Sequence, residues 1–164
     1  DLILTTALGY EVACRIGEAQ TGAVETERGF HNPPANGPFS AAAAVGKLLG
    51  FDHDTHTRAF GIAGSHCGGL VEYAWEGSMT KRLHLGRAAQ LGLESALLAE
   101  KGFTGPSTII EGKYGYLNAF SPSPKIEKLL DGIGETWLLE TLNIKAYPVH
   151  MTTQAIVTAV SKRW

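Results

Sequence analysis

The stretch that organises this chain is Gly77-Ser78-Met79-Thr80-Lys81-Arg82-Leu83-His84-Leu85-Gly86. It places two fixed cations, two hydroxyl groups and an imidazole between two glycines, directly before a strongly helical run. Lysine, arginine and the unpaired N–H groups of a helix start all favour a negative charge nearby. The stretch therefore indicates an anion site, although the charges alone are equally compatible with a solvent-exposed basic helix start.

Residues 85–100, which follow this cluster, carry the clearest helical pattern. Their apolar and small side chains repeat at helical spacing and predict one buried face. That face consists of Leu85, Ala88, Ala89, Gly92, Leu93, Ala96 and Leu97. Gly102 is expected to end this helix.

The N-terminal half predicts three more helices. Leu4, Leu8, Val12 and Ile16 recur every fourth residue, which is typical of an amphipathic helix of about four or five turns. The i,i+4 pair of Glu11 and Arg15 supports the same helix. Further helices are expected over residues 38–49, opened by Pro38 and ended by Gly50, and after a cap at Asp52 or Asp54, with Ala59, Phe60, Ile62 and Ala63 buried.

Between the first two helices, residues 20–37 are polar and rich in glycine and proline, which predicts a loop. Such a long loop is often functional, and this one contains His31. Histidine suits proton transfer near neutral pH. The alternative is a loop histidine that hydrogen-bonds only to backbone.

The C-terminal part begins with a helix predicted over residues 104–120. The run Ser121-Pro122-Ser123-Pro124 then breaks the chain. Residues 142–146 alternate apolar and polar side chains as a strand does. His150 follows at the predicted strand end, and Thr152 or Thr153 is expected to cap a last helix. We therefore expect a helical domain over residues 1–121 and the start of another domain over residues 122–164.

Composition narrows the class of protein. The 164 residues are 44% hydrophobic with a net charge of −2, which suits a domain with a core and argues against a general nucleic-acid binder. Glycine and charged residues interrupt every apolar run, so no membrane span is expected. Cys14 and Cys67 are isolated, which favours reduced thiols. The chain starts and ends inside helical patterns, so we expect a piece of a longer protein.

Two other clusters have simpler explanations than a site. The residues of Asp52-His53-Asp54-Thr55-His56 are too closely spaced, without a second ligand group, to predict a metal centre, and a helix cap is the better interpretation. His66 and Cys67 are adjacent, so they would not face each other on a helix. Neither a phosphate-binding glycine loop nor a nucleophile elbow is present.

Several motifs together resemble the MmgE/PrpD family. They follow in order along nearly the whole chain: Gly9-Tyr10-Glu11-Val12-Ala13, Arg15-Ile16-Gly17, Gly29-Phe30-His31, Gly37-Pro38-Phe39 with Ala41 to Ala44, Lys47-Leu48-Leu49-Gly50, Gly77-Ser78-x-Thr80-Lys81-Arg82-Leu83-His84-x-Gly86, Gly102-Phe103-Thr104-Gly105-Pro106 and Lys145-x-Tyr147-Pro148-x-His150. The resemblance implies a mainly α fold: an all-helical domain, here without its N-terminal part, and the first strand and helix of a smaller α+β lid domain.

The resemblance also implies site residues. His31, Lys81 and His150 match catalytic positions, and Arg82 and His84 match the same segment as substrate-binding residues. The family implies a homodimer without a cofactor or metal that acts on a small polycarboxylate, with neither nucleic acid nor membrane as partner. A cytoplasmic location, or the mitochondrial matrix in a eukaryote, is expected.

The family resemblance implies a lyase of the propionate-metabolism type that dehydrates a 2-methylcitrate-like hydroxy acid. Cations would hold the carboxylates and a histidine would move the proton. Asn32-Pro33-Pro34 after His31 departs from the proline-threonine that often follows this histidine in the family, so the substrate stays open. The alternatives are a cis-aconitate-type decarboxylase, a dicarboxylate isomerase or epimerase, and a non-catalytic helical dimerisation module.

Overall fold

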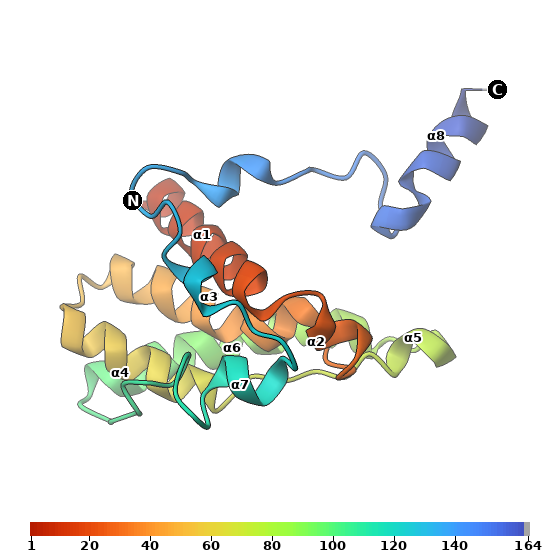
Figure 1. The fold of residues 1–164 in the computed structure, drawn as a ribbon. Helices are drawn as coiled ribbons and strands as arrows, with labels where there is room; N and C mark the ends of the chain where they lie inside the picture. Colours follow the sequence, from red (N-terminus) through yellow and green to blue (C-terminus); the bar gives the residue numbers. More distant parts are fainter. Residues whose placement is uncertain (163–164) are drawn as a thin grey trace.

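The protein, described here by a computed structural model over residues 1–162, is a helical body followed by an extended C-terminal part (Figure 1). Its long helices are α1 (Leu2–Gln20), α3 (Asn32–Leu48), α4 (His53–Gly64) and α6 (Thr80–Glu100). The shorter elements are α2 (Ala23–Thr26), α5 (Tyr73–Glu76), α7 (Tyr116–Phe120), η1 (Ile126–Leu129), η2 (Leu138–Thr141), η3 (Met151–Thr153) and α8 (Gln154–Ser161). The mainly helical fold expected from the sequence is confirmed.

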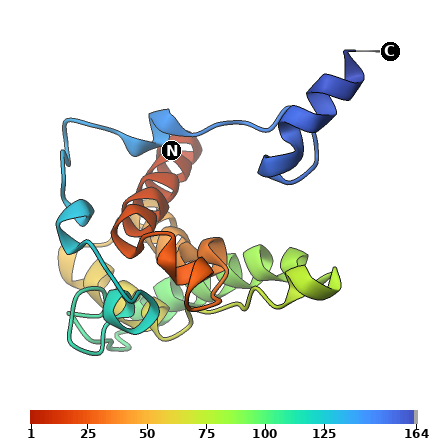
Figure 2. The same ribbon diagram turned by 45° about the vertical axis from the view of Figure 1, so that its right-hand side comes forward.

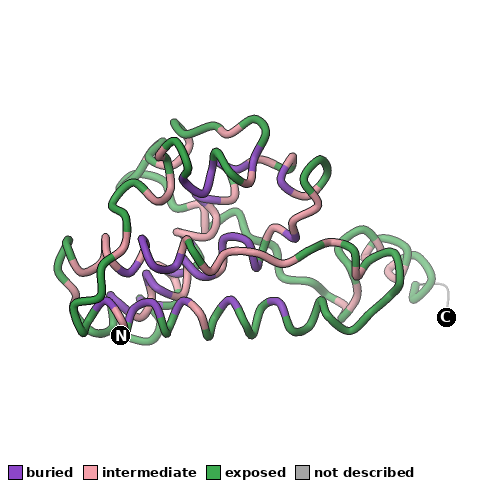
Figure 3. The backbone as a smooth tube through the Cα atoms, turned by 90° about the horizontal axis from the view of Figure 1, so that it is seen from below, coloured by how far each residue is buried: buried purple, intermediate pink, exposed green. Residues whose placement is uncertain are grey.

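Helix α3 lies at the centre of the body, packed against α1, α4 and α6. Phe39 of α3 is fully buried, and its ring meets Phe60 of α4 and Tyr116 of α7 edge-on, with centroids 5.8 and 5.2 Å apart. Figure 2 shows the C-terminal part extending from the body. Buried residues concentrate in the body, whereas the C-terminal part is mostly exposed (Figure 3). The core thus depends on helix packing around α3.

Helices α3 and α6 approach each other closely because small residues line their contact. A Cβ on Gly92 would lie 2.4 Å from the Pro38 carbonyl oxygen. Ala88, Gly92 and Ala96 are buried as predicted, but the leucines of the predicted stripe and Ala89 face outward. The exposed members are Leu85, Ala89, Leu93 and Leu97. That part of the prediction is wrong because close backbone approach leaves no room for leucine.

Gly92→Ala is expected to destabilise the protein by about 1–3 kcal/mol, because the added methyl group overlaps backbone atoms that cannot move away cheaply. Gly86→Ala is the matched control on the same helix, since nothing lies within 4 Å of its added Cβ. That variant should gain up to about 1 kcal/mol from helix propensity. Urea unfolding of both variants measures the difference, and equal midpoints would contradict the close approach.

The start of α3 corrects the loop predicted over residues 20–37. Helix α3 begins at Asn32, with His31 as its N-cap residue, and Pro33 and Pro34 lie in its first turn. Proline is tolerated there because the first N–H groups of a helix have no partner within the helix. Pro38 therefore lies inside the helix instead of opening it, and the short helix α2 occupies part of the predicted loop.

Two other helices agree with their sequence signals. Helix α1 covers the predicted four-residue repeat. Asp52 caps α4, because its carboxylate accepts a hydrogen bond of 2.8 Å from the Thr55 backbone N–H. The cluster from Asp52 to His56 therefore contains the helix cap predicted from the sequence.

The C-terminal predictions need two corrections. Only Tyr116–Phe120 of the helix expected over residues 104–120 forms, because the preceding segment folds into turns that pack Gly105 against Gly61, where a Cβ would lie 2.6 Å from backbone. Residues 142–146, predicted as a strand, form none, and Ile144 is 98% exposed. A strand needs a partner, and residues 1–162 offer none.

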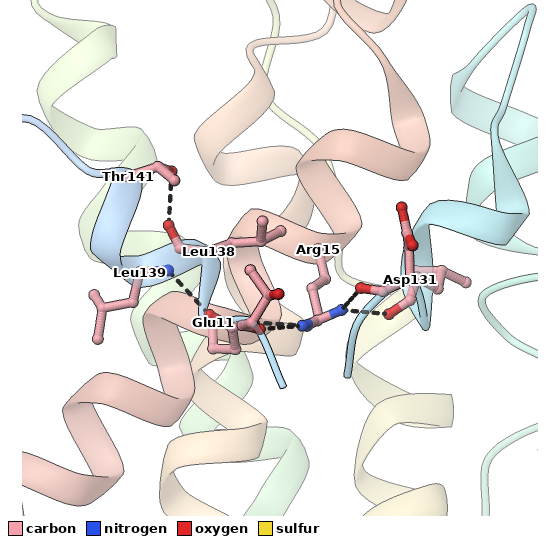
Figure 4. A network of polar contacts seen from close by, with 8 residues as sticks. Glu11, Arg15, Asp131, Leu138, Leu139 and Thr141 are labelled. Atoms are coloured by element: carbon pink, nitrogen blue, oxygen red, sulfur yellow. Dashed lines mark hydrogen bonds and ion pairs between the residues drawn. The ribbon is translucent and has the colours of Figure 1, made fainter. Parts of the chain in front are cut away.

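The segment after residue 124 is tied to α1 by a buried ion pair (Figure 4). Arg15 donates from Nε to Glu11 Oε1 at 2.7 Å, and its guanidinium also donates to the carbonyls of Asp131 and Thr136, both at 2.8 Å. The second Glu11 oxygen accepts from the Leu139 N–H at 3.0 Å.

Within residues 1–162, none of the helices is long and apolar enough to span a membrane.

Candidate active site

A short backbone pairing brings the segment before α3 beside the segment before α5. The His31 N–H donates to the Gly69 carbonyl and the Val71 N–H donates to the Gly29 carbonyl, both at 2.9 Å. Phe30 and Leu70 form the isolated antiparallel bridge between them. This pairing places His31 at the start of α3 close to Tyr73 at the start of α5.

His31 and His84 form the centre of the candidate site. Their Nδ1 atoms lie 3.1 Å apart, within hydrogen-bond distance, and the two residues are only 6% and 8% exposed. The Tyr73 ring meets both imidazoles edge-on, with centroids 5.2 Å from His31 and 5.5 Å from His84. The three rings therefore form one packed cluster from α3, α5 and α6.

Lys81 adds a positive charge to this cluster. Its Nζ lies 5.3 Å from the centre of the Tyr73 ring, in a cation–π contact. Lys81 and His84 are three residues apart in the first turns of α6 and so share a face. No acidic residue lies in the first turn of α6, so the helix dipole and Lys81 both favour an anion at this end.

Two hollows border His84. The larger, of about 340 Å³, is lined by Leu70, Glu72, Tyr73, Glu76, Ser78, Thr80 and His84. The smaller, of about 120 Å³, is lined by Pro34, His66, Gly68, Gly69, His84, Arg87, Ala88 and Leu91. The larger hollow has room for a small acid, and Lys81 lies beside its wall at Tyr73. Glu72 and Glu76 in the lining carry negative charge, which favours an acid bound toward Lys81.

Burial, the largest cause, together with the nearby His84 and Lys81, lowers the pKa of His31 from 6.5 to about 4. A histidine in this state is neutral at pH 7 and is charged only in acid. The site therefore holds an uncharged imidazole beside a lysine ammonium. The uncharged imidazole is the form of histidine that accepts a proton.

Lys81→Met is expected to raise the pKa of His31 above about 4, because it removes a positive charge that opposes protonation. The value should stay below 6.5, since burial, the largest cause, is unchanged. NMR titration of the His31 ring measures this shift. Arg82→Met removes an exposed cation from the same turn and should shift the pKa of His31 less. Equal shifts in the two variants would show that Lys81 acts on His31 no more strongly than Arg82 does.

The remaining predicted residues are placed differently. Arg82 is exposed in the first turn of α6, beside Lys81. His150 precedes η3, is exposed, and lies 2.9 Å from the Thr152 hydroxyl through its Nδ1. The η3–α8 segment extends away from the helical body in both views (Figures 1 and 2), so His150 is not brought to His31 and Lys81. Among the described residues, the hydrogen bonds of this segment are local, such as those between Gln154 and Tyr147.

Tyr73 is the site residue that sequence reasoning missed. Its only sequence signal is an aromatic residue shortly before the basic cluster. The contact with His31 arises from the pairing of residues 29–31 with residues 69–71, which no local pattern indicates. The pairing of His31 with His84 was likewise not anticipated.

Comparison with known proteins identifies the family. The sequence model of the MmgE/PrpD N-terminal domain matches residues 1–129. The chain belongs to the MmgE/PrpD family. The match covers the whole helical body and all four residues of the cluster formed by His31, Tyr73, Lys81 and His84.

The MmgE/PrpD chain is also similar to curated proteins. It is 36% identical to a cis-aconitate decarboxylase of Aspergillus terreus over 95% of its length, and 35% identical to a cis-aconitate decarboxylase-like protein of Aspergillus oryzae over 90%. It is 32% identical to the cis-aconitate decarboxylase of Mus musculus over 98%. The chain spans about a third of these relatives, namely 34%, 32% and 33% of their lengths.

Proposed function

We propose that the protein containing this chain is a lyase acting on small di- or tricarboxylates, in which His31 transfers a proton and Lys81 binds a substrate carboxylate. The observation that carries this proposal is a buried, neutral His31 within one packed cluster with His84, Tyr73 and Lys81. Arg82, exposed on the same turn, would bind a second carboxylate.

Decarboxylation of a cis-aconitate-like acid is the first candidate reaction, because the relatives carry that name. The bond from carbon to one carboxyl group breaks, CO2 leaves and its electron pair stays on carbon. The resulting carbanion then takes a proton, which the protonated form of His31 would donate. A lysine near the developing negative charge would stabilise it, and carboxylates bound at Lys81 would favour proton uptake by His31.

Dehydration of a 2-methylcitrate-like acid is the second candidate, because His31 is neutral at pH 7 and so can accept a proton. A neutral imidazole can remove the proton next to a carboxylate as hydroxide leaves with a proton from a second acid. His150, which matched a catalytic histidine by family resemblance, is the candidate for that second group. It would have to come to the cluster from a different arrangement of the η3–α8 segment.

A non-catalytic dimerisation module is the alternative from another class. Such a module needs neither two buried imidazoles nor a lysine beside them, although the pairing of His31 with His84 reduces the cost of their burial. A homodimer, the domain boundary at residue 121 and the cellular compartment stay predictions alongside the reaction.

Incubation of the intact protein with cis-aconitate, 2-methylcitrate and citrate, followed by NMR, tests the proposal. Decarboxylation would release CO2 and leave a dicarboxylate, whereas dehydration would release water and create a new carbon–carbon double bond without loss of carbon. Turnover of none of these acids, or of related di- and tricarboxylates, would contradict the proposed lyase.

A further inference from the structure

We infer that His84 is a positioning residue for His31: the Nδ1-to-Nδ1 hydrogen bond leaves Nε2 as the only nitrogen of His31 that can exchange a proton with substrate. The inference rests on the proposed function for its catalytic meaning. It gives His84 a role different from the substrate binding expected from the sequence.

The geometry of the pair supports this role. Two imidazole nitrogens 3.1 Å apart can share one proton, with one ring donating and the other accepting. Either way Nδ1 of His31 is occupied. Because both residues are buried, water does not compete freely for this bond.

The surroundings hold the His84 ring in place. The Tyr73 ring meets it edge-on. Gly69 also lies close to it, because a Cβ added to Gly69 would be 3.4 Å from His84 Cε1 and 2.8 Å from Pro34. Gly69 has a φ of +102°, which L side chains rarely adopt. The ring is therefore enclosed by the same backbone pairing that positions His31.

The shared proton couples the two rings. When it lies on Nδ1 of His31, Nε2 of His31 is bare and acts as a base. If Nε2 then accepts a proton from substrate, the Nδ1 proton can pass to Nδ1 of His84, and the positive charge moves to His84. When the proton returns from His84 to Nδ1 of His31 and Nε2 gives its own proton to product or solvent, His31 is again in the base form. Charged and titratable groups around the pair include Lys81, Tyr73, Glu72, Glu76, His66 and Arg87.

Three variants in the intact protein test this role. His84→Leu replaces the imidazole by an apolar side chain of similar size and so removes the hydrogen bond. His84→Asn places an amide near the Nδ1 position, where it can donate or accept. His53→Asn is the control, because the His53 side chain is 91% exposed on α4.

We expect His84→Leu to lower kcat at least about tenfold with KM within about twofold, since proton transfer by a positioned group contributes large factors to rate. His84→Asn should recover most of that loss, and His53→Asn should change nothing. A rise in KM with kcat unchanged would overturn the inference in favour of direct substrate binding. Unchanged kinetics in His84→Leu would also overturn it.

Nitrogen-15 NMR of the His31 ring gives a second readout that needs no substrate. The unmodified protein and His84→Asn should show a hydrogen-bonded Nδ1 in a fixed tautomer, whereas His84→Leu should show a mixture of tautomers. If His84→Leu does not fold, the tautomer in the unmodified protein and in His84→Asn still decides the matter. If the unmodified protein shows the hydrogen-bonded Nδ1 but turns over none of the acids, the proposed function fails and the positioning role stands. An unpaired Nδ1 in the unmodified protein would contradict the positioning role.

Discussion

His31→Asn is expected to lower kcat of the intact protein on its polycarboxylate substrate by about 100- to 10,000-fold, the usual range for a positioned acid or base. His31 is the buried, neutral imidazole of the cluster, and asparagine cannot exchange the proton that its ring exchanges. KM should change little, because Lys81 and Arg82, and not His31, are the proposed binders of the substrate carboxylates. Steady-state kinetics with the substrate found by NMR measures both constants.

The control is His53→Asn, which removes an exposed histidine of α4 and should leave both constants unchanged. The pH profile adds an independent check. The fraction of neutral His31 falls as pH drops through its pKa of about 4, so kcat/KM in the unmodified protein should fall only in that acid range. An acid limb near 6.5 in the unmodified protein, or a kcat of His31→Asn within about threefold of normal, would exclude His31 as the base.

Sequence patterns predicted those parts of the fold whose structure depends on neighbouring residues. The four-residue repeat through Ile16 predicted α1, and the cap at Asp52 predicted the start of α4, because both are local effects. The pair of Glu11 and Arg15 was also visible from its spacing. Its burial under residues 129–139 was not, because that contact joins segments more than a hundred residues apart.

Errors arose where tertiary packing outweighs local signals. Pro33 and Pro34 predicted a loop, although proline is equally suited to the first turn of a helix. The leucines of α6 predicted a buried face, whereas close contact with α3 at Gly92 selects the small residues. The strand over residues 142–146 had the right alternation but no partner strand within the described residues.

The residues of the candidate site could mostly be predicted from the sequence, but the contacts between them could not. His31, Lys81 and His84 were identified from residue type and family resemblance, and the structure places them with Tyr73 in one cluster. The distance between the two imidazoles depends on the pairing of Gly29 to His31 with Gly69 to Val71, for which a single sequence carries no signal.

Arg15→Met is expected to destabilise the protein by about 3–5 kcal/mol, because it leaves the Glu11 carboxylate buried without its partner. Glu11 is 7% exposed and Arg15 6% exposed, so water cannot easily replace the lost contact. The carbonyls of Asp131 and Thr136 would also lose their donor, which should loosen the segment from η1 to η2 (Figure 4). Urea unfolding measures the stability, and amide hydrogen exchange at Leu139 reports on the segment.

Lys128→Met is the matched control, because Lys128 pairs with the side chain of the same Asp131 at 2.7 Å but in solvent, where the two side chains are 43% and 62% exposed. Its loss should cost much less than the loss of the buried pair, because solvent screens the exposed charges. The double variant Glu11→Leu with Arg15→Met should recover part of the stability, since replacing both partners removes the unpaired buried charge. Leu139 would exchange quickly in both Arg15→Met and the double variant, because its N–H depends on Glu11 held in place by Arg15. Equal losses in Arg15→Met and Lys128→Met would show that burial gives the Glu11–Arg15 pair no special weight in holding the C-terminal segment to α1.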